Sequence, residues 1–159
     1  MTVTRVTGDL LDQPVAAIVN PWNRNVIPWW LLISQGVSGA IKRRAGTGPF
    51  KEVARHVPIP LGGAVVTGAG RLPLEAIVHV AGINLLWRSS EKSVRDAVRN
   101  ALAACAGRGL ASVAVPLIGA GSGGGREDHV EAWILDELAT IDATGGYAGA
   151  VRVVRYGKG

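Results

Sequence analysis

The stretch that decides the fold is residues 112–129, which read SVAVPLIGAGSGGGREDH. It begins as a short apolar run, Ser112–Val115, of the kind that forms a buried strand. Five of the seven residues from Gly119 to Gly125 are glycine. Glu127–Ile141 then carries apolar residues at the spacing of one helix face. Since a glycine-rich loop before a helix leaves backbone N–H groups bare beside a positive helix end, the stretch predicts a phosphate or pyrophosphate site. A flexible surface loop is the alternative.

The loop belongs to neither of the two common phosphate-binding motifs. No Gly-Lys-Ser/Thr follows it, which excludes a P-loop, and the dinucleotide fingerprint belongs to the first strand–helix turn of a domain. Glycine is abundant in the whole chain, at 22 of 159 residues, roughly twice the usual share of about 7%. The excess has no collagen period and forms no linker, so it is best explained by functional loops and turns.

The remaining apolar pattern alternates between short strand-like runs and longer helix-like segments. The predicted strands, besides Ser112–Val115, are Thr2–Val6, Ala16–Val19, Ala64–Thr67, Ala76–Val80 and Val151–Tyr156. The predicted helices, besides Glu127–Ile141, are Val37–Ala45 and Ser90–Ala106, with Ser89 or Ser90 as the cap of the latter. Strands interleaved with helices indicate an α/β layered fold with a largely parallel or mixed sheet. A length of 159 residues predicts one domain spanning residues 1–159.

Charge and composition set weaker limits on function. The formal net charge is +5, which favours anionic partners or simply a soluble basic surface. Nucleic-acid binding would use Lys42-Arg43-Arg44 and the basic tail Arg152, Arg155 and Lys158, but solvated faces explain these clusters more simply. One cysteine excludes an intramolecular disulfide, and no His/Cys/Asp cluster has metal-ligand spacing, so no metal is expected. Without a signal peptide or membrane span, we expect no membrane association and a cytoplasmic location.

Two further loops follow predicted strands, where open α/β sheets bind ligands. Asp9, directly after the first strand, is placed to accept a hydrogen bond from an adenine amine or to cap a helix. Asn20 and Asn23 end the second strand; tethering the loop is the simpler role for Asn20, and the role of Asn23 is open. Three of the eight aromatic residues lie close together here, and they either cover a core edge or line a binding site; they are Trp22, Trp29 and Trp30.

Taken in order, these loops resemble a macrodomain, the ADP-ribose-binding fold. The family's motifs are matched in sequence order over nearly the whole chain. They are Gly8-Asp9-Leu10, Val19-Asn20-Pro21-Trp22-Asn23, Gln35-Gly36-Val37-Ser38-Gly39-Ala40-Ile41, Gly62-Gly63-Ala64-Val65-Val66-Thr67, Ile77-Val78-His79-Val80-Ala81-Gly82 and Pro116–Gly121. The resemblance implies a three-layer α/β/α fold around a mixed, mostly parallel sheet of about six strands. It implies no cofactor.

The resemblance also implies a site. Asp9 with the Leu10 backbone would meet the adenine, and Asn23 would hold the distal ribose. Further ligand contacts would come from Asn20, Gly36, Val37, Ser38, Gly119, Ala120, Gly121, Ser122, Gly123 and Gly124. Three departures matter: Ser38 stands where hydrolytic members often have Asp, glycine stands at 123 or 124 where an aromatic often covers the ribose, and the first loop is longer, with Arg24–Ile33 inserted. Trp29 or Trp30 is the candidate replacement wall.

The long tryptophan-containing loop resembles a bacterial macrodomain group that removes ADP-ribose from acidic side chains. The expected function is therefore hydrolysis of mono-ADP-ribose from modified proteins, with Asn23 and Ser38 as the catalytic candidates, in a monomer. A reader that binds ADP-ribose without turnover and an O-acetyl-ADP-ribose deacetylase are the alternatives. His79 is expected to be a core histidine, and His129 is a weak acid–base candidate.

Overall fold

The computed structural model describes residues 1–23, 36–83, 89–121 and 126–157, except for the side chains of Asn23 and Ile83. Within them, six strands form one sheet in the order β1-β6-β5-β2-β4-β3. The strands are β1 (Thr2–Gly8), β2 (Ala17–Asn23), β3 (Ala64–Thr67), β4 (Ala76–Ile83), β5 (Ser112–Pro116) and β6 (Ala150–Tyr156). All neighbouring strands are parallel except β3 and β4, which are antiparallel. The predicted mixed, mostly parallel sheet is confirmed.

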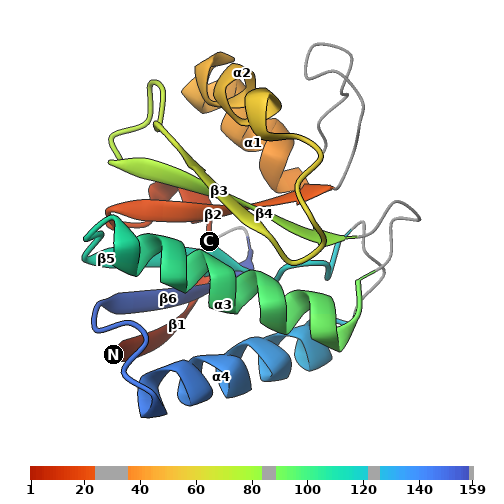
Figure 1. Ribbon diagram of the computed structural model, residues 1–159, viewed down its shortest axis with the longest axis vertical. Coiled ribbons are helices and arrows are strands. Elements are labelled where there is room, and N and C mark those ends of the chain that lie inside the picture. Colours follow the sequence, from red (N-terminus) through yellow and green to blue (C-terminus); the bar gives the residue numbers. More distant parts are fainter. Residues whose placement is uncertain (24–35, 84–88, 122–125, 158–159) are drawn as a thin grey trace.

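Helices cover both faces of this sheet (Figure 1). The helices α1 (Gly36–Ala45) and α2 (Gly48–Val53) lie on one face, and α3 (Glu91–Gly107) and α4 (Glu127–Ala143) lie on the other. Two single-turn 3-10 helices, η1 (Leu10–Asp12) and η2 (Ala54–His56), complete the described elements. The three-layer α/β/α arrangement is therefore confirmed. Among the described residues, no helix has the length and apolar character needed to cross a membrane.

Strand alternation builds two separate cores, because successive side chains of a strand point to opposite faces. Along β2, Ala17 and Val19 pack with α3 and α4, whereas Ile18 and Trp22 pack with α1 and α2. Trp22 is 2% exposed, and its ring centroid lies 5.6 Å from that of Phe50. Trp22 is thus a core residue. Of the two roles that the sequence left open for it, the structure shows packing in the core.

Local signals place most element boundaries. Ser90 caps α3 by accepting a hydrogen bond from the Ser93 N–H, and the Ser93 hydroxyl accepts one in return from the Ser90 N–H. The predicted end of the second strand at Val19 is wrong, since β2 continues to Asn23 through Pro21. A proline normally breaks a central strand because it lacks an N–H. Here the ladder between β2 and β5 ends at Ile18–Ala114, so β2 is paired only with β4 where Pro21 stands.

The short helix α2 and both 3-10 turns were not predicted from the sequence. Helix α2 has six residues, with Pro49 in its first turn and three buried residues, Pro49, Phe50 and Val53. Six residues are too few for a helical apolar period to stand out from a loop. Packing of Phe50 against the sheet therefore accounts for this helix better than any local pattern does.

Candidate functional site

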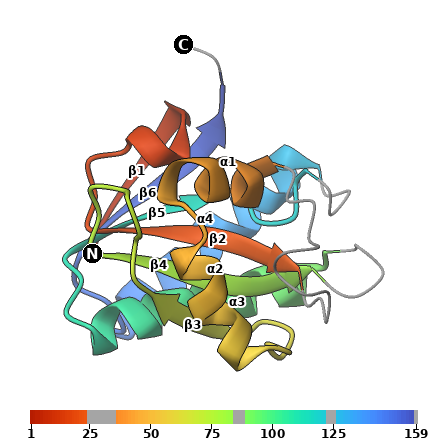
Figure 2. The same cartoon turned by 90° about the horizontal axis from the view of Figure 1, so that it is seen from above.

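The candidate site lies where β2 and β5 end. From β2 the chain leads to α1 on one face of the sheet, and from β5 it leads to α4 on the other. In α/β sheets, ligands bind beyond the carboxyl ends of two neighbouring parallel strands when the helices that follow these strands lie on opposite faces of the sheet. Figure 2 shows β2 and β4 pointing to this same edge. The β2–β5 ladder stops after two residue pairs, so the strands are unpaired with each other beyond Ile18 and Ala114.

The first turn of α1 forms one side of this junction. Gly36 opens the helix with a φ of +59°, and no atom of the described residues lies within 4 Å of the position a Cβ would occupy. No acidic residue stands in the first turn, so no side-chain carboxylate there opposes the partial positive charge of the helix end. Val37 and Ser38 are partly buried. The described geometry suits the approach of an anion to the backbone N–H groups of this turn.

The turn that follows β5 forms the other side. Gly119 has a φ of +85°, and a Cβ built on it would lie 2.4 Å from the Ser89 Cβ. Glycine is required here for both reasons. The Ser89 hydroxyl donates to the Gly119 carbonyl at 3.3 Å, which ties the turn to the start of α3. Ala120 donates to the Leu117 carbonyl at 3.1 Å, and Gly121 is exposed, with no described atom within 4 Å of the position a Cβ would occupy. The turn is thus fixed at Gly119 by its contact with Ser89, whereas Gly121 is exposed.

A chain of polar side chains lies under α1. The Ser38 Oγ lies 2.7 Å from Asn20 Oδ1 and 3.2 Å from the Pro21 carbonyl oxygen. Asn20 Nδ2 lies 3.0 Å from His79 Nδ1, and His79 Nε2 lies 2.9 Å from Thr67 Oγ1. Asn20 and His79 have no exposed surface. Asn20 therefore joins β2 to α1 and β4, which agrees with the tethering role expected for it.

His79 is a core histidine, as the sequence suggested. Its ring centroid lies 6.0 Å from those of Trp22 and Phe50, edge to face with each. Burial lowers the pKa of His79 from 6.5 to about 3, because an uncompensated imidazolium is unfavourable away from water. The ring is neutral at physiological pH and acts as a hydrogen-bonding group. His129 is an exposed residue of α4 whose ring contacts Trp133.

Asp9 is already engaged where the resemblance places the adenine. Its Oδ1 accepts a hydrogen bond from the Leu11 N–H at 2.8 Å and so caps η1. Its Oδ2 lies 3.6 Å from Arg44 Nη1, while Arg44 Nη2 lies 2.7 Å from Asp12 Oδ1. The structure thus shows the capping role that the sequence left open. Arg44 is a neighbour of this group that was not predicted, since it lies 35 positions further along the chain than Asp9.

Two of the basic residues proposed for nucleic-acid binding, Arg44 and Arg155, are paired with acids. Arg155 contacts Glu127, Asp128 and Glu131 at 3.0, 3.0 and 2.7 Å, and its hydrogen bonds to Glu131 and Asp128 raise its pKa. Arg152 donates to Gln13 at 3.3 Å. Lys158 lies outside the described residues. The tail is therefore not a bare cationic surface where the structure describes it.

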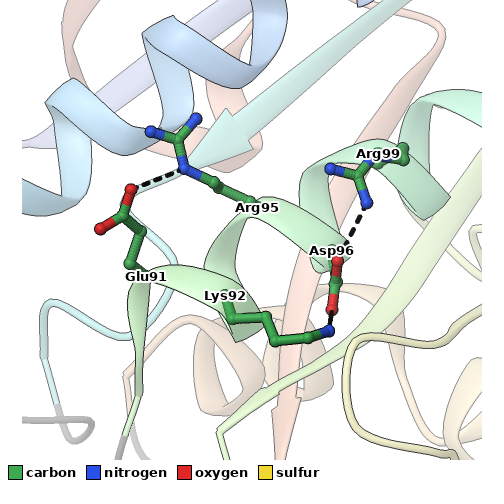
Figure 3. A pocket seen from close by; sticks show the side chains of 5 residues that line it. All are labelled: Glu91, Lys92, Arg95, Asp96 and Arg99. Atoms are coloured by element: carbon green, nitrogen blue, oxygen red, sulfur yellow. Dashed lines mark hydrogen bonds and ion pairs between the residues drawn. The ribbon is translucent and has the colours of Figure 1, made fainter.

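A hollow of about 400 Å³ lies on the outer side of α3, away from the β2–β5 junction. Figure 3 shows its charged lining, Glu91, Lys92, Arg95, Asp96 and Arg99, joined in pairs by ion contacts. Arg95 also contacts Asp136 of α4 at 2.6 Å. Exposed ion pairs of this kind contribute little to the stability of the fold. Because these charged side chains already contact opposite charges, their presence does not indicate a ligand site. The hollow is an ion-paired surface of two packed helices.

Several predicted site residues cannot be placed. Trp29, Trp30, Ser122, Gly123 and Gly124 lie outside the described residues, and Asn23 is described only by its backbone at the end of β2. Among the residues that are described, no three His, Cys, Asp or Glu side chains form a group able to hold a metal ion. The described part of the candidate site therefore consists of Asp9, Leu10, Asn20, Gly36, Val37, Ser38, Gly119, Ala120 and Gly121.

Comparisons with known proteins agree with this architecture. The macro domain family model matches residues 19–134. A macro domain-containing protein of Listeria monocytogenes is 36% identical over 129 residues, which is 76% of this chain and 69% of that protein. The O-acetyl-ADP-ribose deacetylase of Escherichia coli is 36% identical over 124 residues, 73% of this chain and 66% of that protein. The chain spans 60% of the length of one curated relative and 84% of another.

A solved structure resembles the fold over almost its whole length. The Oceanobacillus iheyensis macrodomain with ADP is similar with a TM-score of 0.83 at 25% identity, over 98% of this chain and 84% of that one.

Proposed function

Because this chain belongs to the macro domain family, we propose that it binds ADP-ribose and hydrolyses mono-ADP-ribose from modified proteins, cleaving its ester bond to glutamate or aspartate. The observation that carries the proposal is the junction of β2 and β5, because the chain continues from β2 to the start of α1 and from β5 to the turn braced at Gly119. In both turns, the groups proposed to contact the diphosphate are backbone N–H groups. Such groups suit a diphosphate, because they can surround it closely without a charged partner.

In this proposal the ligand lies along the carboxyl edge of the sheet. Gly36 and Val37 contact the diphosphate from one side, and Gly119, Ala120, Gly121, Ser122, Gly123 and Gly124 contact it from the other. Asp9 and the Leu10 backbone take the adenine, whose amine would donate to the Asp9 oxygen that now faces Arg44. Asn23 orients the distal ribose, and Trp29 or Trp30 covers it.

Hydrolysis requires an oriented water and a stabilised leaving group. Attack of water on the anomeric carbon breaks its bond to the ester oxygen and releases free ADP-ribose and the protein carboxylate, with one proton passing to solvent. A serine hydroxyl cannot serve as a carboxylate base at neutral pH. The substrate's own phosphate therefore holds the water while Asn23 orients the ribose, and the protein acts as a monomer without a metal or cofactor.

Two alternatives each rest on one observation. The 36% identity to the Escherichia coli protein named O-acetyl-ADP-ribose deacetylase favours removal of an acetyl group from the same ADP-ribose handle. The first turn of α1 carries Ser38 and no acidic residue, so it supplies no carboxylate base. This favours a reader that binds ADP-ribose without turnover.

Calorimetric titration with ADP-ribose tests binding, and incubation with a mono-ADP-ribosylated protein then tests turnover. We expect saturable binding and loss of the label within an hour. A parallel incubation with O-acetyl-ADP-ribose measures deacetylation. Binding with an unchanged label and intact O-acetyl-ADP-ribose would leave the reader as the function, and absence of ADP-ribose binding would refute the proposal as a whole.

A further inference from the structure

The buried polar side chains form one unbroken chain of hydrogen-bond contacts from α1 to the end of β3. It runs from Ser38 through Asn20 and His79 to Thr67, whose Oγ1 lies 3.0 Å from the Gly68 carbonyl oxygen. Asn20, His79 and Thr67 are buried, whereas Ser38 is partly exposed. Ser38 is therefore the member of the chain that a ligand can reach.

Two directions of proton donation are possible in such a chain. A neutral imidazole carries one N–H and one acceptor nitrogen, so the nitrogen that is protonated decides which neighbour must donate. His79 is neutral because burial lowers its pKa to about 3. Asn20 and Thr67 sit on opposite ring nitrogens. The His79 tautomer, the Asn20 amide orientation and the hydroxyl directions are thus coupled.

The carbonyl at the Thr67 end selects one direction. A carbonyl oxygen only accepts, so the 3.0 Å contact to Gly68 requires Thr67 to donate its single hydroxyl proton there. Thr67 must then accept from His79 Nε2–H, and His79 Nδ1 must accept from the Asn20 amide. At the other end, the competing contact from Ser38 to the Pro21 carbonyl is longer, at 3.2 Å. Asn20 Oδ1 consequently faces Ser38 and accepts its proton at 2.7 Å.

We propose that Thr67 and His79, acting through Asn20, fix the Ser38 hydroxyl as a donor to Asn20 Oδ1. Ser38 then has only acceptor lone pairs left for a ligand. Such a hydroxyl accepts a hydrogen bond from a sugar hydroxyl or from water, and it repels an anionic oxygen that brings no proton. Ser38 is then a specificity-determining acceptor, and Thr67 and His79 are positioning residues that act through Asn20. The direction of the chain is a property of the free protein, whereas the identity of the donor rests on the proposed function.

The direction is tested by nitrogen-15 NMR of the full-length, ligand-free protein. The chain has three histidines, and comparison with His79→Gln assigns the signals of His79. We expect His79 to be neutral and protonated at Nε2. Protonation at Nδ1 would overturn the proposal, because it requires the Asn20 amide to be turned and its N–H to face Ser38.

A substitution at the far end of the chain gives a sharper test. Aspartate only accepts, so in Ser38→Asp the Asn20 amide must turn its N–H towards position 38, and its oxygen must face His79. We expect Ser38→Asp to move the His79 proton from Nε2 to Nδ1, whereas Ser38→Ala leaves it at Nε2. An unchanged tautomer in Ser38→Asp would show that the chain is not coupled and would refute the relay.

The donor is identified by comparing ADP-ribose with ADP, which lacks the distal sugar. We expect Ser38→Ala and Thr67→Val to weaken ADP-ribose binding about fivefold to tenfold and ADP binding less than twofold, with Thr67→Ser close to the unsubstituted protein. Equal losses for both ligands would refute a sugar-side acceptor. If the unsubstituted protein binds neither ligand, the proposed function fails, and the tautomer measurements still decide the direction of the chain.

Discussion

Replacing His79 with glutamine should remove a large part of the acid sensitivity of this protein. His79 is fully buried against Trp22 and Phe50, and burial lowers its pKa from 6.5 to about 3. The unfolded chain therefore binds a proton at this residue below about pH 6.5, whereas the folded protein stays neutral until about pH 3. The stability associated with the neutral ring is fully present above pH 6.5 and is lost as the pH falls towards 3.

The size of the effect follows from this pKa difference. One pKa unit corresponds to about 1.4 kcal/mol, so the loss amounts to about 3 kcal/mol between pH 7.5 and pH 4.5. Glutamine has no titrating group, yet its amide can both donate and accept in the place of the ring. The difference in unfolding free energy between the unsubstituted protein and His79→Gln should therefore shrink by about 3 kcal/mol over this range.

Urea unfolding at several pH values measures this difference directly. Every other titrating group is present in both proteins, so its contribution cancels in the comparison. Thr67→Val serves as the control, since it removes a hydrogen-bond partner of His79 but keeps the titrating ring. Its unfolding free energy should still fall steeply as the pH is lowered. Parallel stability curves for the unsubstituted protein and His79→Gln would show that His79 is not a buried neutral base and would refute the reasoning.

Three further substitutions probe the site. Gly121→Glu should weaken ADP-ribose binding about 30-fold in calorimetry through repulsion of the diphosphate, and Gly121→Gln much less, because none of the described atoms lies within 4 Å of a Cβ there; equal losses would assign the effect to side-chain bulk. Gly119→Ala should lower the unfolding free energy by about 2 kcal/mol, since it combines a positive φ with a clash against Ser89; unchanged thermal unfolding would contradict the close approach. Asn23→Ala should reduce kcat for label release at least about tenfold while the Kd for ADP-ribose changes less than about threefold; a loss confined to Kd would make Asn23 a binding residue only.

The sequence was sufficient for the layers and for the sheet because burial periodicity is a local property. Strands such as Ala64–Thr67 and helices such as Glu127–Ala143 were predicted within a few residues. Glu127–Ala143 is long enough for its apolar residues to show a 3.6-residue repeat, whereas Ala64–Thr67 was recognised as a short apolar run bounded by glycine. The extension of β2 beyond Val19 was not predictable, because whether a proline is tolerated depends on which neighbour pairs with it.

Some features of the candidate site could likewise be predicted from the sequence, and others could not. The glycine loop and the start of α1 are readable in the chain because they are contiguous motifs beside helix starts. The contacts that orient Ser38 are not, since Asn20, Thr67 and His79 come from three strands. Register alone places Asn20 opposite His79 across the β2–β4 ladder. The pairing of Asp9 with Arg44 likewise depends on how α1 packs over the sheet.

By itself the sequence determined the α/β class, the family and the position of the glycine-rich turns, because these depend on residue type and spacing. Only the tertiary structure decided that Trp22 belongs to the core, that Asp9 caps η1, and that Ser38, Asn20, His79 and Thr67 lie in one series of hydrogen-bond contacts. The physical reason is that protonation and hydrogen-bond direction depend on burial and on partners from distant segments. Residue spacing along the chain carries no information about either.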